Sequence, residues 1–198
     1  MKLVLATRNR AKLEELRRIL APLVPVEVLG LDDVPAYDEV PESGATFEDN
    51  ALIKAREAVR RTGLPAVADD SGLAVDALNG MPGVLSARWA GSAASDEANL
   101  RLVLEQVADV PDARRGAAFV CAAVLVTPGG LERVVRGEMA GTLLRAPRGT
   151  NGFGYDPVFV PTGHDRTTAE MTPAEKDAIS HRGIAFRALA PHVATALS

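Results

Sequence analysis

The sequence predicts an α/β fold in which a mixed β-sheet is flanked by helices. In the first half, short apolar runs of strand length alternate with segments in which apolar residues recur at helical spacing. In the second half, two β-rich runs are joined by Pro128-Gly129-Gly130, which indicates a long antiparallel hairpin. With 198 residues, 47% of them hydrophobic, the chain can bury a core without disulfides or a structural metal. We expect one domain over residues 1–198, built as a compact body or as two closely packed lobes.

The first half is expected to alternate strands and helices. The first helix is predicted by Leu13, Leu16, Ile19 and Leu20, which form an apolar stripe. The second helix begins in capping-box style at Thr46-Phe47-Glu48-Asp49 and is ended by glycine and proline. In order, we expect a strand at residues 2–6, a helix at 7–20 and a second strand at 26–29. A Pro-, Asp- and Glu-rich loop follows at 30–45, and a second helix at 46–63.

The second half is expected to be richer in strands. Residues 66–68 form a strand that leads into Asp69-Asp70-Ser71-Gly72, and residues 73–78 continue extended. Thr172-Pro173-Ala174-Glu175 predicts a helix start, because Thr suits the N-cap, Pro the first position and Glu the third. A turn is expected at 80–83 and a helix that begins at Ser95-Asp96 at 95–107. Four further strands are expected at 117–127, 131–136, 142–145 and 158–160.

Composition and charge exclude several classes of protein. The formal net charge of −4 argues against a general binder of nucleic-acid polymers, which usually shows a basic excess. No segment approaches the ~20 apolar residues that span a bilayer, and the first six residues are too short for a secretory signal. We therefore expect a cytoplasmic protein without a membrane partner. The single cysteine, Cys121, lies in an apolar run and is expected to be a buried thiol in a strand.

The first candidate site is the strand–turn–helix segment Thr7-Arg8-Asn9-Arg10-Ala11-Lys12. A helix N-terminus offers unpaired N–H groups and a partial positive charge, and Lys12 leans back toward it from one turn inside the helix. Only four of the 22 basic residues are lysines, and Lys12, Lys54 and Lys176 all lie within motifs. Their retention in an arginine-rich chain hints at point-charge contacts with phosphate. The alternative is an ordinary capped helix with a solvated lysine.

The second candidate site is acidic. Adjacent strand residues face opposite ways, so only one of Asp69 and Asp70 can point straight into a site at this strand's end. Mg²⁺ accepts one or two carboxylates together with substrate phosphates, so this pair with Glu42 would suffice. A polar turn with helix-like capping is the equally weighted alternative.

Two further motifs favour ligand binding, the first of a nucleobase and the second of a nucleobase edge or a phosphate. The loop from Gly149 to Pro157 carries three glycines and two aromatics, which allow close backbone approach and a stacking face. Lys176 and Ser180 share a helix face, and Ser180-His181-Arg182 follows at a break marked by Gly183. A mobile surface loop and a solvated helix end are the corresponding structural alternatives.

Taken in series, these motifs resemble the inosine/xanthosine triphosphate pyrophosphatase family, whose members remove deaminated purine nucleotides. The match runs from residue 3 to about residue 187, and the five motifs occur in order. The resemblance implies an elongated mixed sheet with two lobes and an active-site cleft between them, a homodimer and a Mg²⁺ cofactor.

The resemblance also implies roles for single residues. Thr7, Arg8, Asn9, Arg10, Ala11 and Lys12 would cradle the triphosphate. Asp70 would lie at the metal and the attacking water, with Glu42 as second ligand, although Pro41 departs from the family's pattern there. The remaining expected substrate contacts are Ser71, Phe153, Gly154, Tyr155, Asp156, Lys176, His181 and Arg182.

The expected reaction is Mg²⁺-dependent cleavage of ITP, dITP or XTP to the nucleoside monophosphate and pyrophosphate. A water activated by a carboxylate would attack the α-phosphorus, with Asp69 as a further metal ligand. A donor from Arg182 or the loop backbone would favour the 6-oxo group of these purines over the amine of adenine. A pyrophosphatase for modified pyrimidine or methylated nucleotides, and a nucleotide-sensing module without turnover, are the rival hypotheses.

Overall fold

The computed structural model describes residues 1–20, 22–38 and 40–197. The chain folds into two units. Unit 1 comprises Met1–Asp70, Cys121–Gly137 and Arg182–Ser198, and unit 2 comprises Ser71–Val120 and Glu138–His181. Residue 39 of the expected loop and residues 21 and 198 lie outside the described part of the chain.

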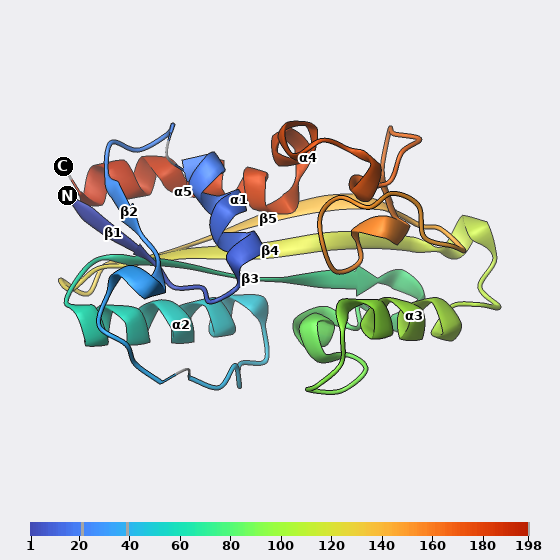
Figure 1. Cartoon of the computed structure of the whole chain (residues 1–198), viewed down its shortest axis with the longest axis horizontal. Coiled ribbons are helices and arrows are strands. Elements are labelled where there is room, and N and C mark those ends of the chain that lie inside the picture. The colour runs from blue at the N-terminus through green and yellow to red at the C-terminus, as the bar shows by residue number, and fades with distance from the viewer. Residues whose placement is uncertain (21, 39, 198) are drawn as a thin grey trace. The chain divides into compact units, whose positions relative to one another are not determined.

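The described strands form one six-stranded sheet in the order β2-β1-β3-β4-β5-β6 (Figure 1). β1 is parallel to both β2 and β3, whereas β5 and β6 are antiparallel, so the expected mixed sheet is confirmed. The Thr127 N–H donates to the Leu131 carbonyl at 3.0 Å and closes the tight connection from β4 to β5. The strands are β1 (Lys2–Leu5), β2 (Glu27–Leu29), β3 (Ala66–Val75), β4 (Gly116–Val126), β5 (Glu132–Leu143) and β6 (Phe159–Pro161).

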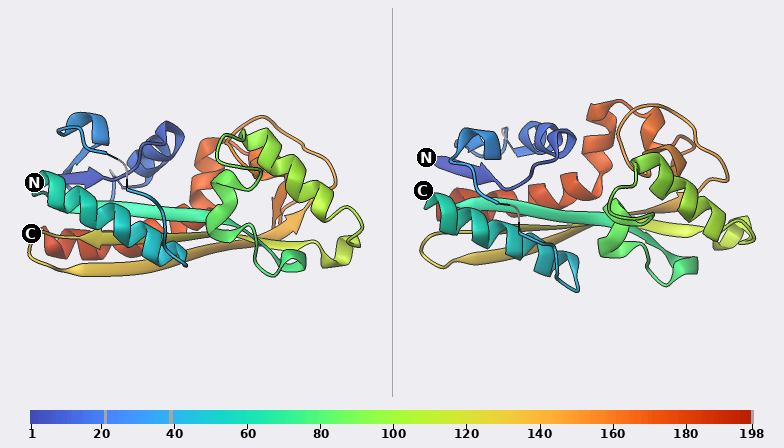
Figure 2. Two further views of the ribbon diagram at one scale, coloured as in Figure 1. Left: turned by 90° about the horizontal axis from the view of Figure 1, so that it is seen from below. Right: turned by 60° about the horizontal axis from the view of Figure 1, so that its bottom comes forward.

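Five α-helices accompany the sheet in the described residues. In unit 1, α1 and α5 cover one face of the strands and α2 covers the other, as the further views in Figure 2 also show. None of the described helices is both long and apolar enough to cross a membrane. The helices are α1 (Arg10–Leu20), α2 (Phe47–Thr62), α3 (Asp96–Gln106), α4 (Pro173–Ile179) and α5 (His181–Ala196).

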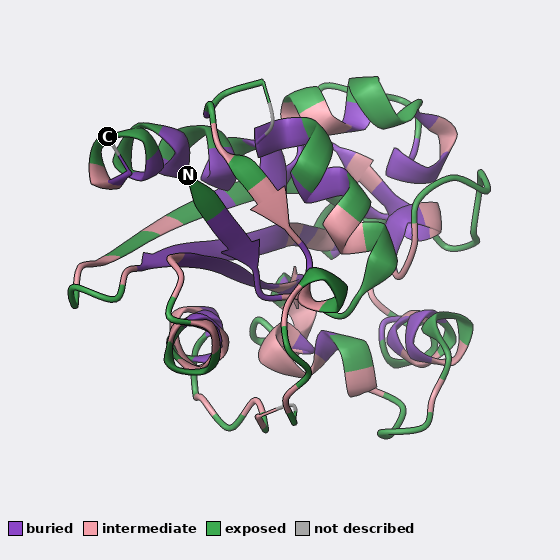
Figure 3. Cartoon of the chain, turned by 60° about the vertical axis from the view of Figure 1, so that its left-hand side comes forward, coloured by how far each residue is buried: buried purple, intermediate pink, exposed green. Residues whose placement is uncertain are grey.

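The two faces of unit 1 bury separate cores, and β3 shows how the sequence divides between them. Val67 packs in the core beneath α1 and α5, whereas Ala66 and Ala68 pack beneath α2. Figure 3 shows the resulting burial of the strands between exposed helix surfaces. Because side chains alternate along a strand, Asp69 continues the face of Val67, and Asp70 continues the face of Ala68. This alternation separates the two neighbouring aspartates.

Unit 2 has a core of its own. It combines the second half of β3 with α3, the ends of β4 and β5, and β6. The rings of Phe119 and Phe159 lie 4.6 Å apart at 56° within it. Its largest members are Leu73, Leu100, Phe119, Met139, Leu143, Tyr155 and Phe159.

Three helix starts expected from the sequence are confirmed. Thr46 and Asp49 form a reciprocal capping box at α2, with both hydrogen bonds at 3.1 Å. Ser95 caps α3, and Thr172 forms a second capping box with Glu175 at α4. These caps satisfy N–H groups that the first turn of a helix leaves without a partner.

Three expectations about the elements are wrong. The strand expected at 66–68 does not end before Asp69-Asp70-Ser71-Gly72, because β3 runs through this stretch from Ala66 to Val75, which excludes the polar turn kept as the alternative. The strands expected at 131–136 and 142–145 are one strand, β5. His181 begins α5 instead of ending a helix, because Ser180 adopts an extended conformation that separates α4 from α5. Gly183 therefore lies inside α5 and does not mark a break.

Candidate active site

The beginning of α1 is the segment where the sequence predicts a phosphate-binding site. Asn9 precedes the helix, and its Oδ1 accepts the Lys12 N–H at 3.1 Å. The Thr7 hydroxyl accepts the Asn9 N–H at 3.3 Å, which fixes the turn out of β1. Arg8, Asn9 and Arg10 are exposed, and the Arg8 guanidinium donates to the Tyr37 carbonyl. The segment therefore presents helix N–H groups and three cationic side chains together.

A buried chain of alternating charges lies against this seat. The Lys12 Nζ is 3.5 Å from Asp69 Oδ2, and the Arg182 Nε donates to the same oxygen at 3.2 Å. The Arg182 Nη1 donates to Glu15 Oε2 at 2.9 Å. Burial alone lowers the pKa of Arg182, but Glu15 and Asp69 outweigh it and raise that pKa, so the guanidinium stays charged. Arg182 is thus engaged by two carboxylates in the interior of unit 1.

A second polar group lies on the α2 face. Asn50 Nδ2 donates to Asp70 Oδ2 at 3.0 Å, and the Lys54 Nζ lies 2.6 Å from Glu42 Oε1 and 3.5 Å from Asp70 Oδ1. The Gly44 N–H donates to Asn50 Oδ1 at 2.8 Å and ties the loop that carries Glu42 to α2. Burial raises the pKa of Asp70, although Lys54 opposes the rise. Burial opposes protonation of Lys54, but the neighbouring carboxylates raise its pKa.

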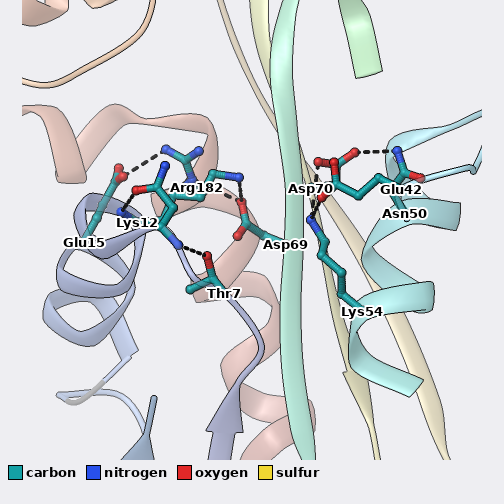
Figure 4. A network of polar contacts seen from close by, with 10 residues as sticks. Thr7, Lys12, Glu15, Glu42, Asn50, Lys54, Asp69, Asp70 and Arg182 are labelled. Carbon is teal, nitrogen blue, oxygen red and sulfur yellow. Dashed lines mark hydrogen bonds and ion pairs between the residues drawn. The ribbon is translucent and has the colours of Figure 1, made fainter. Parts of the chain in front are cut away.

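Asp69 and Asp70 therefore point to opposite sides of β3, as Figure 4 shows. The carboxylate that faces α1 is Asp69, whereas Asp70 faces α2. This placement contradicts the expectation that Asp69 serves as a ligand of the ion held by Asp70. The cause is the unbroken strand, whose side chains alternate between its two faces through this stretch.

Both aspartates nevertheless lie at one edge of the sheet. β1 ends at Leu5, which pairs with Val67, whereas β3 continues beyond that point. The chain leaves β1 toward α1 there, so the edge of β3 beside Asp69 and Asp70 lies past the end of its parallel neighbour. Ligands of open α/β sheets commonly bind at such a place, outside the carboxyl ends of parallel strands.

The donor set on the α2 face fits Mg²⁺. Glu42 and Asp70 already share one cation, the ammonium of Lys54. Mg²⁺ takes one or two protein carboxylates and completes its octahedron with water and phosphate oxygens. Within the described ranges, no group of three or more His, Cys, Asp or Glu side chains is placed to hold a metal by itself. Glu42 and Asp70 therefore suit an ion that substrate phosphate helps to hold.

The glycine-rich loop of unit 2 is organised around Asp156. Its Oδ2 accepts the Phe153 N–H at 2.9 Å and the Lys176 Nζ at 2.6 Å. The Lys176 Nζ also lies 5.2 Å from the centroid of the Phe153 ring. Gly152 has φ +74°, and a Cβ there would lie 2.1 Å from Asp156 Oδ2, so the loop requires glycine at this position. The structure thus brings Phe153, Asp156 and Lys176 together.

Other expected substrate contacts are occupied within unit 2. The buried Tyr155 hydroxyl donates to the Ser86 carbonyl at 2.8 Å, and burial raises its pKa. The Gly154 N–H donates to Asp96 at 2.9 Å. The His181 ring stacks on Phe119, with centroids 4.9 Å apart and an interplanar angle of 11°. Tyr155 therefore packs in the core and does not offer a free stacking face.

The whole chain matches proteins of one family. The model of the Ham1 family matches residues 3–192. The chain belongs to the Ham1 family. A dITP/XTP pyrophosphatase of Nocardia farcinica is 64% identical over 195 residues, covering 98% of this chain and 95% of the relative. A dITP/XTP pyrophosphatase of Mycobacterium tuberculosis H37Rv is 62% identical over 192 residues, with coverages of 96% and 94%.

Solved structures of Ham1 proteins share the fold. The crystal structure of a nucleoside-triphosphatase, dITP/XTP pyrophosphatase, from Mycobacterium abscessus has a TM-score of 0.79 and 63% sequence identity. It covers 96% of this chain and 98% of that one. A HAM1 protein from Coxiella burnetii has a TM-score of 0.87, 42% identity and 98% coverage of both chains.

Sequence reasoning missed three residues that this Ham1 chain places beside expected ones, namely Asn50, Glu15 and Thr168, and it noted Lys54 without its carboxylate partners. Asn50 and Lys54 contact Asp70, Glu15 contacts Arg182, and Thr168 contacts Asp156. One signal was available, since Asn50 and Lys54 are one helical turn apart and lysine is rare in the chain. Glu15 and Thr168 carry no such signal, because their partners are distant in sequence.

Proposed function

We propose that this chain hydrolyses the non-standard purine nucleoside triphosphates ITP, dITP and XTP to the monophosphate and pyrophosphate. The observation that carries the proposal is the sheet edge of unit 1. There, the beginning of α1 with Lys12 offers a seat for phosphate, and Asp70 with Glu42 offers carboxylates for a divalent cation. The names of the relatives as dITP/XTP pyrophosphatases support this substrate class.

Asp70 and Glu42 are the proposed ligands of Mg²⁺. When bound, Mg²⁺ supplies charge neutralisation at phosphate oxygens and acidifies a coordinated water. Lys54, which contacts both carboxylates, holds them in place and limits their mutual repulsion. Asn50 fixes the orientation of the Asp70 carboxylate through its amide.

The proposed reaction is an attack of water on the α-phosphorus. The water oxygen forms a bond to phosphorus, its proton passes to a carboxylate, and the bond from the α-phosphorus to the bridging oxygen of pyrophosphate breaks. Lys12 and the N–H groups at the beginning of α1 stabilise the charge that develops on the phosphates. No covalent bond to the protein is needed.

Product analysis of the purified protein tests this function. With Mg²⁺, ITP, dITP and XTP are expected to yield monophosphate and pyrophosphate, and chelation of the metal by EDTA is expected to abolish the reaction. Faster cleavage of dUTP or of methylated dNTPs would favour the rival pyrophosphatases. Nucleotide binding without any product would favour a sensing module. Release of a diphosphate and orthophosphate would contradict attack at the α-phosphorus.

Selectivity for a 6-oxo purine is proposed to rest on Lys176 and Phe153. Arg182 or the loop backbone was the donor expected from the sequence, and the Arg182 guanidinium donates to Glu15 and Asp69. The Lys176 ammonium has three donors, one of which goes to Asp156, and it lies beside the Phe153 ring. A lysine donor matches the oxygen at C6 and opposes the amine of adenine.

Replacement of Lys176 by methionine is expected to lower kcat/KM for ITP by roughly 10- to 100-fold, because the 6-oxo group loses its donor. The much lower kcat/KM for ATP is expected to change less than about threefold, so that selectivity collapses. Steady-state kinetics with both nucleotides measure this. Lys2→Met, at an exposed lysine, is the matched control. Equal losses for ITP and ATP would assign Lys176 a role other than reading the base.

We also propose that the chain acts as a single domain and as a cytoplasmic homodimer with Mg²⁺ as its cofactor. The homodimer and the Mg²⁺ cofactor follow from the family resemblance, and the single domain follows from length and composition. Light scattering on the eluting protein measures its mass, and a monomer at micromolar concentration would contradict the dimer.

A further inference from the structure

A short segment of unit 2 forms hydrogen bonds with the glycine-rich loop. It contains the 3₁₀ turn η6 (Thr168–Glu170). The Asn151 N–H donates to the Ala169 carbonyl, and the Asn151 Nδ2 donates to the Met171 carbonyl, both at 3.0 Å. A Cβ at Gly149 would lie 2.4 Å from the carbonyl carbon of Ala169, so loop and turn are in close contact. The loop therefore takes its position from this turn.

Thr168 is the residue of this turn that reaches the polar centre of the loop. Its hydroxyl donates to Asp156 Oδ1 at 2.7 Å, and Thr168 is fully buried. The other carboxylate oxygen, Oδ2, accepts from the Phe153 N–H and from Lys176. Asp156 itself is only 2% exposed. Its two oxygens are thus divided, with Thr168 on one and the loop backbone and Lys176 on the other.

The hydrogen bonds on the two Asp156 oxygens determine the direction of the Lys176 ammonium. A carboxylate turns about its last torsion unless donors hold both oxygens, and a buried oxygen that loses its donor seeks another. Without the Thr168 hydroxyl, rotation of Asp156 moves Oδ2 away from the ammonium and from the Phe153 N–H. Both the direction of the ammonium and the position of the Phe153 ring then become variable.

We propose that Thr168 is a positioning residue for the nucleobase, acting through Asp156 on Lys176 and Phe153. The proposal deepens the function given above and rests on it. In this arrangement Asp156 is an internal anchor, and Lys176 and Phe153 are the groups that meet the base. Thr168 acts on substrate binding and leaves the chemistry at phosphate unchanged.

Kinetics of Thr168→Val test the proposal. Valine keeps the shape and removes the hydroxyl, so KM for ITP is expected to rise roughly five- to thirtyfold, while kcat changes less than about twofold. Thr168→Ser restores the donor and is expected to return KM to within about twofold of the parent. Thr167→Val is the matched control, because this buried neighbour donates to the Arg148 carbonyl and not to Asp156. If Thr168→Val fails to fold, Thr168→Ala is measured in its place.

A readout on the free protein separates this proposal from the proposed function. The chain has four lysines, so ¹H–¹⁵N correlation of lysine ammonium groups gives at most four side-chain signals. Thr168→Val is expected to shift or broaden the Lys176 signal, and Thr167→Val is expected to leave it unchanged. A changed signal with an unchanged KM would support the positioning of Lys176 and contradict its role at the base. An unchanged Lys176 signal would overturn the proposal.

Discussion

Replacement of Asp70 by asparagine is expected to lower kcat for ITP by about 10³-fold at saturating Mg²⁺. The side chain keeps its size, but the cation site is left with Glu42 as its one carboxylate. Lys54 also loses a partner, because the Nζ that faced Asp70 at 3.5 Å now meets a neutral amide. Both effects weaken the hold on a divalent ion, and the loss of a carboxylate that can accept the proton of the attacking water lowers kcat even when Mg²⁺ is saturating. Initial rates over a Mg²⁺ titration measure the loss in kcat and the expected rise in the half-saturating concentration.

Asp69→Asn is the informative control for Asp70, since the two residues are neighbours on opposite faces of β3. Asp69 contacts Lys12 and Arg182, so its loss is expected to weaken phosphate binding and stability, without changing the Mg²⁺ dependence. Near-normal turnover of Asp70→Asn would contradict the assignment. A Mg²⁺ defect confined to Asp69→Asn would reverse the roles of the two faces.

Replacement of Arg182 by leucine is expected to lower the free energy of unfolding by about 3–5 kcal/mol. Glu15 and Asp69 are 3% and 1% exposed, and both depend on the Arg182 guanidinium. Leucine fills much of the space but removes a charged partner from two carboxylates in a poorly solvated interior, while the Lys12 Nζ stays 3.5 Å from Asp69 Oδ2. Urea denaturation measures the change, and a fall of Tm by about 10 °C is expected.

Two controls make this prediction specific to burial. Arg101→Leu removes an exposed arginine whose side chain is 71% accessible and paired with Glu97, and is expected to cost less than about 1 kcal/mol. The double variant Glu15→Met with Arg182→Leu is expected to recover part of the stability, because an apolar pair replaces a buried charge without its partner. If Arg182→Leu were as stable as Arg101→Leu, the buried network would not stabilise the fold.

The sequence predicted the elements well wherever local signals were strong. The capping residues Thr46, Ser95 and Thr172 all begin helices as expected, because their side chains bond to backbone groups three residues away. The strand was predicted too short at Asp69-Asp70-Ser71-Gly72, where polar residues and glycine left a turn open as an alternative. Pairing in the sheet keeps this stretch extended, and such pairing with distant strands cannot be recognised in the local sequence.

The candidate site was predictable in its residues but not in its pairings. Lys12, Asp70, Phe153 and Lys176 all lie in polar clusters that their motifs indicated. The partners of these residues come from other elements, as when Arg182 contacts Glu15 from 167 positions away. The ion pairs of Arg182 with Glu15 and Asp69 could not be predicted, because the burial of Arg182 depends on the packing of α5 against α1.

Asp70 and Glu42 are proposed to hold a divalent ion at the sheet edge where the beginning of α1 binds polyphosphate. Anomalous diffraction from a crystal grown with Mn²⁺ and a non-hydrolysable inosine triphosphate tests it most directly. We predict an anomalous peak about 2.1 Å from oxygens of Asp70 and Glu42 and of the substrate phosphate, with phosphate on the first-turn N–H groups of α1. A peak held by Asp69, or one distant from Asp70 with the nucleotide bound, would contradict the account.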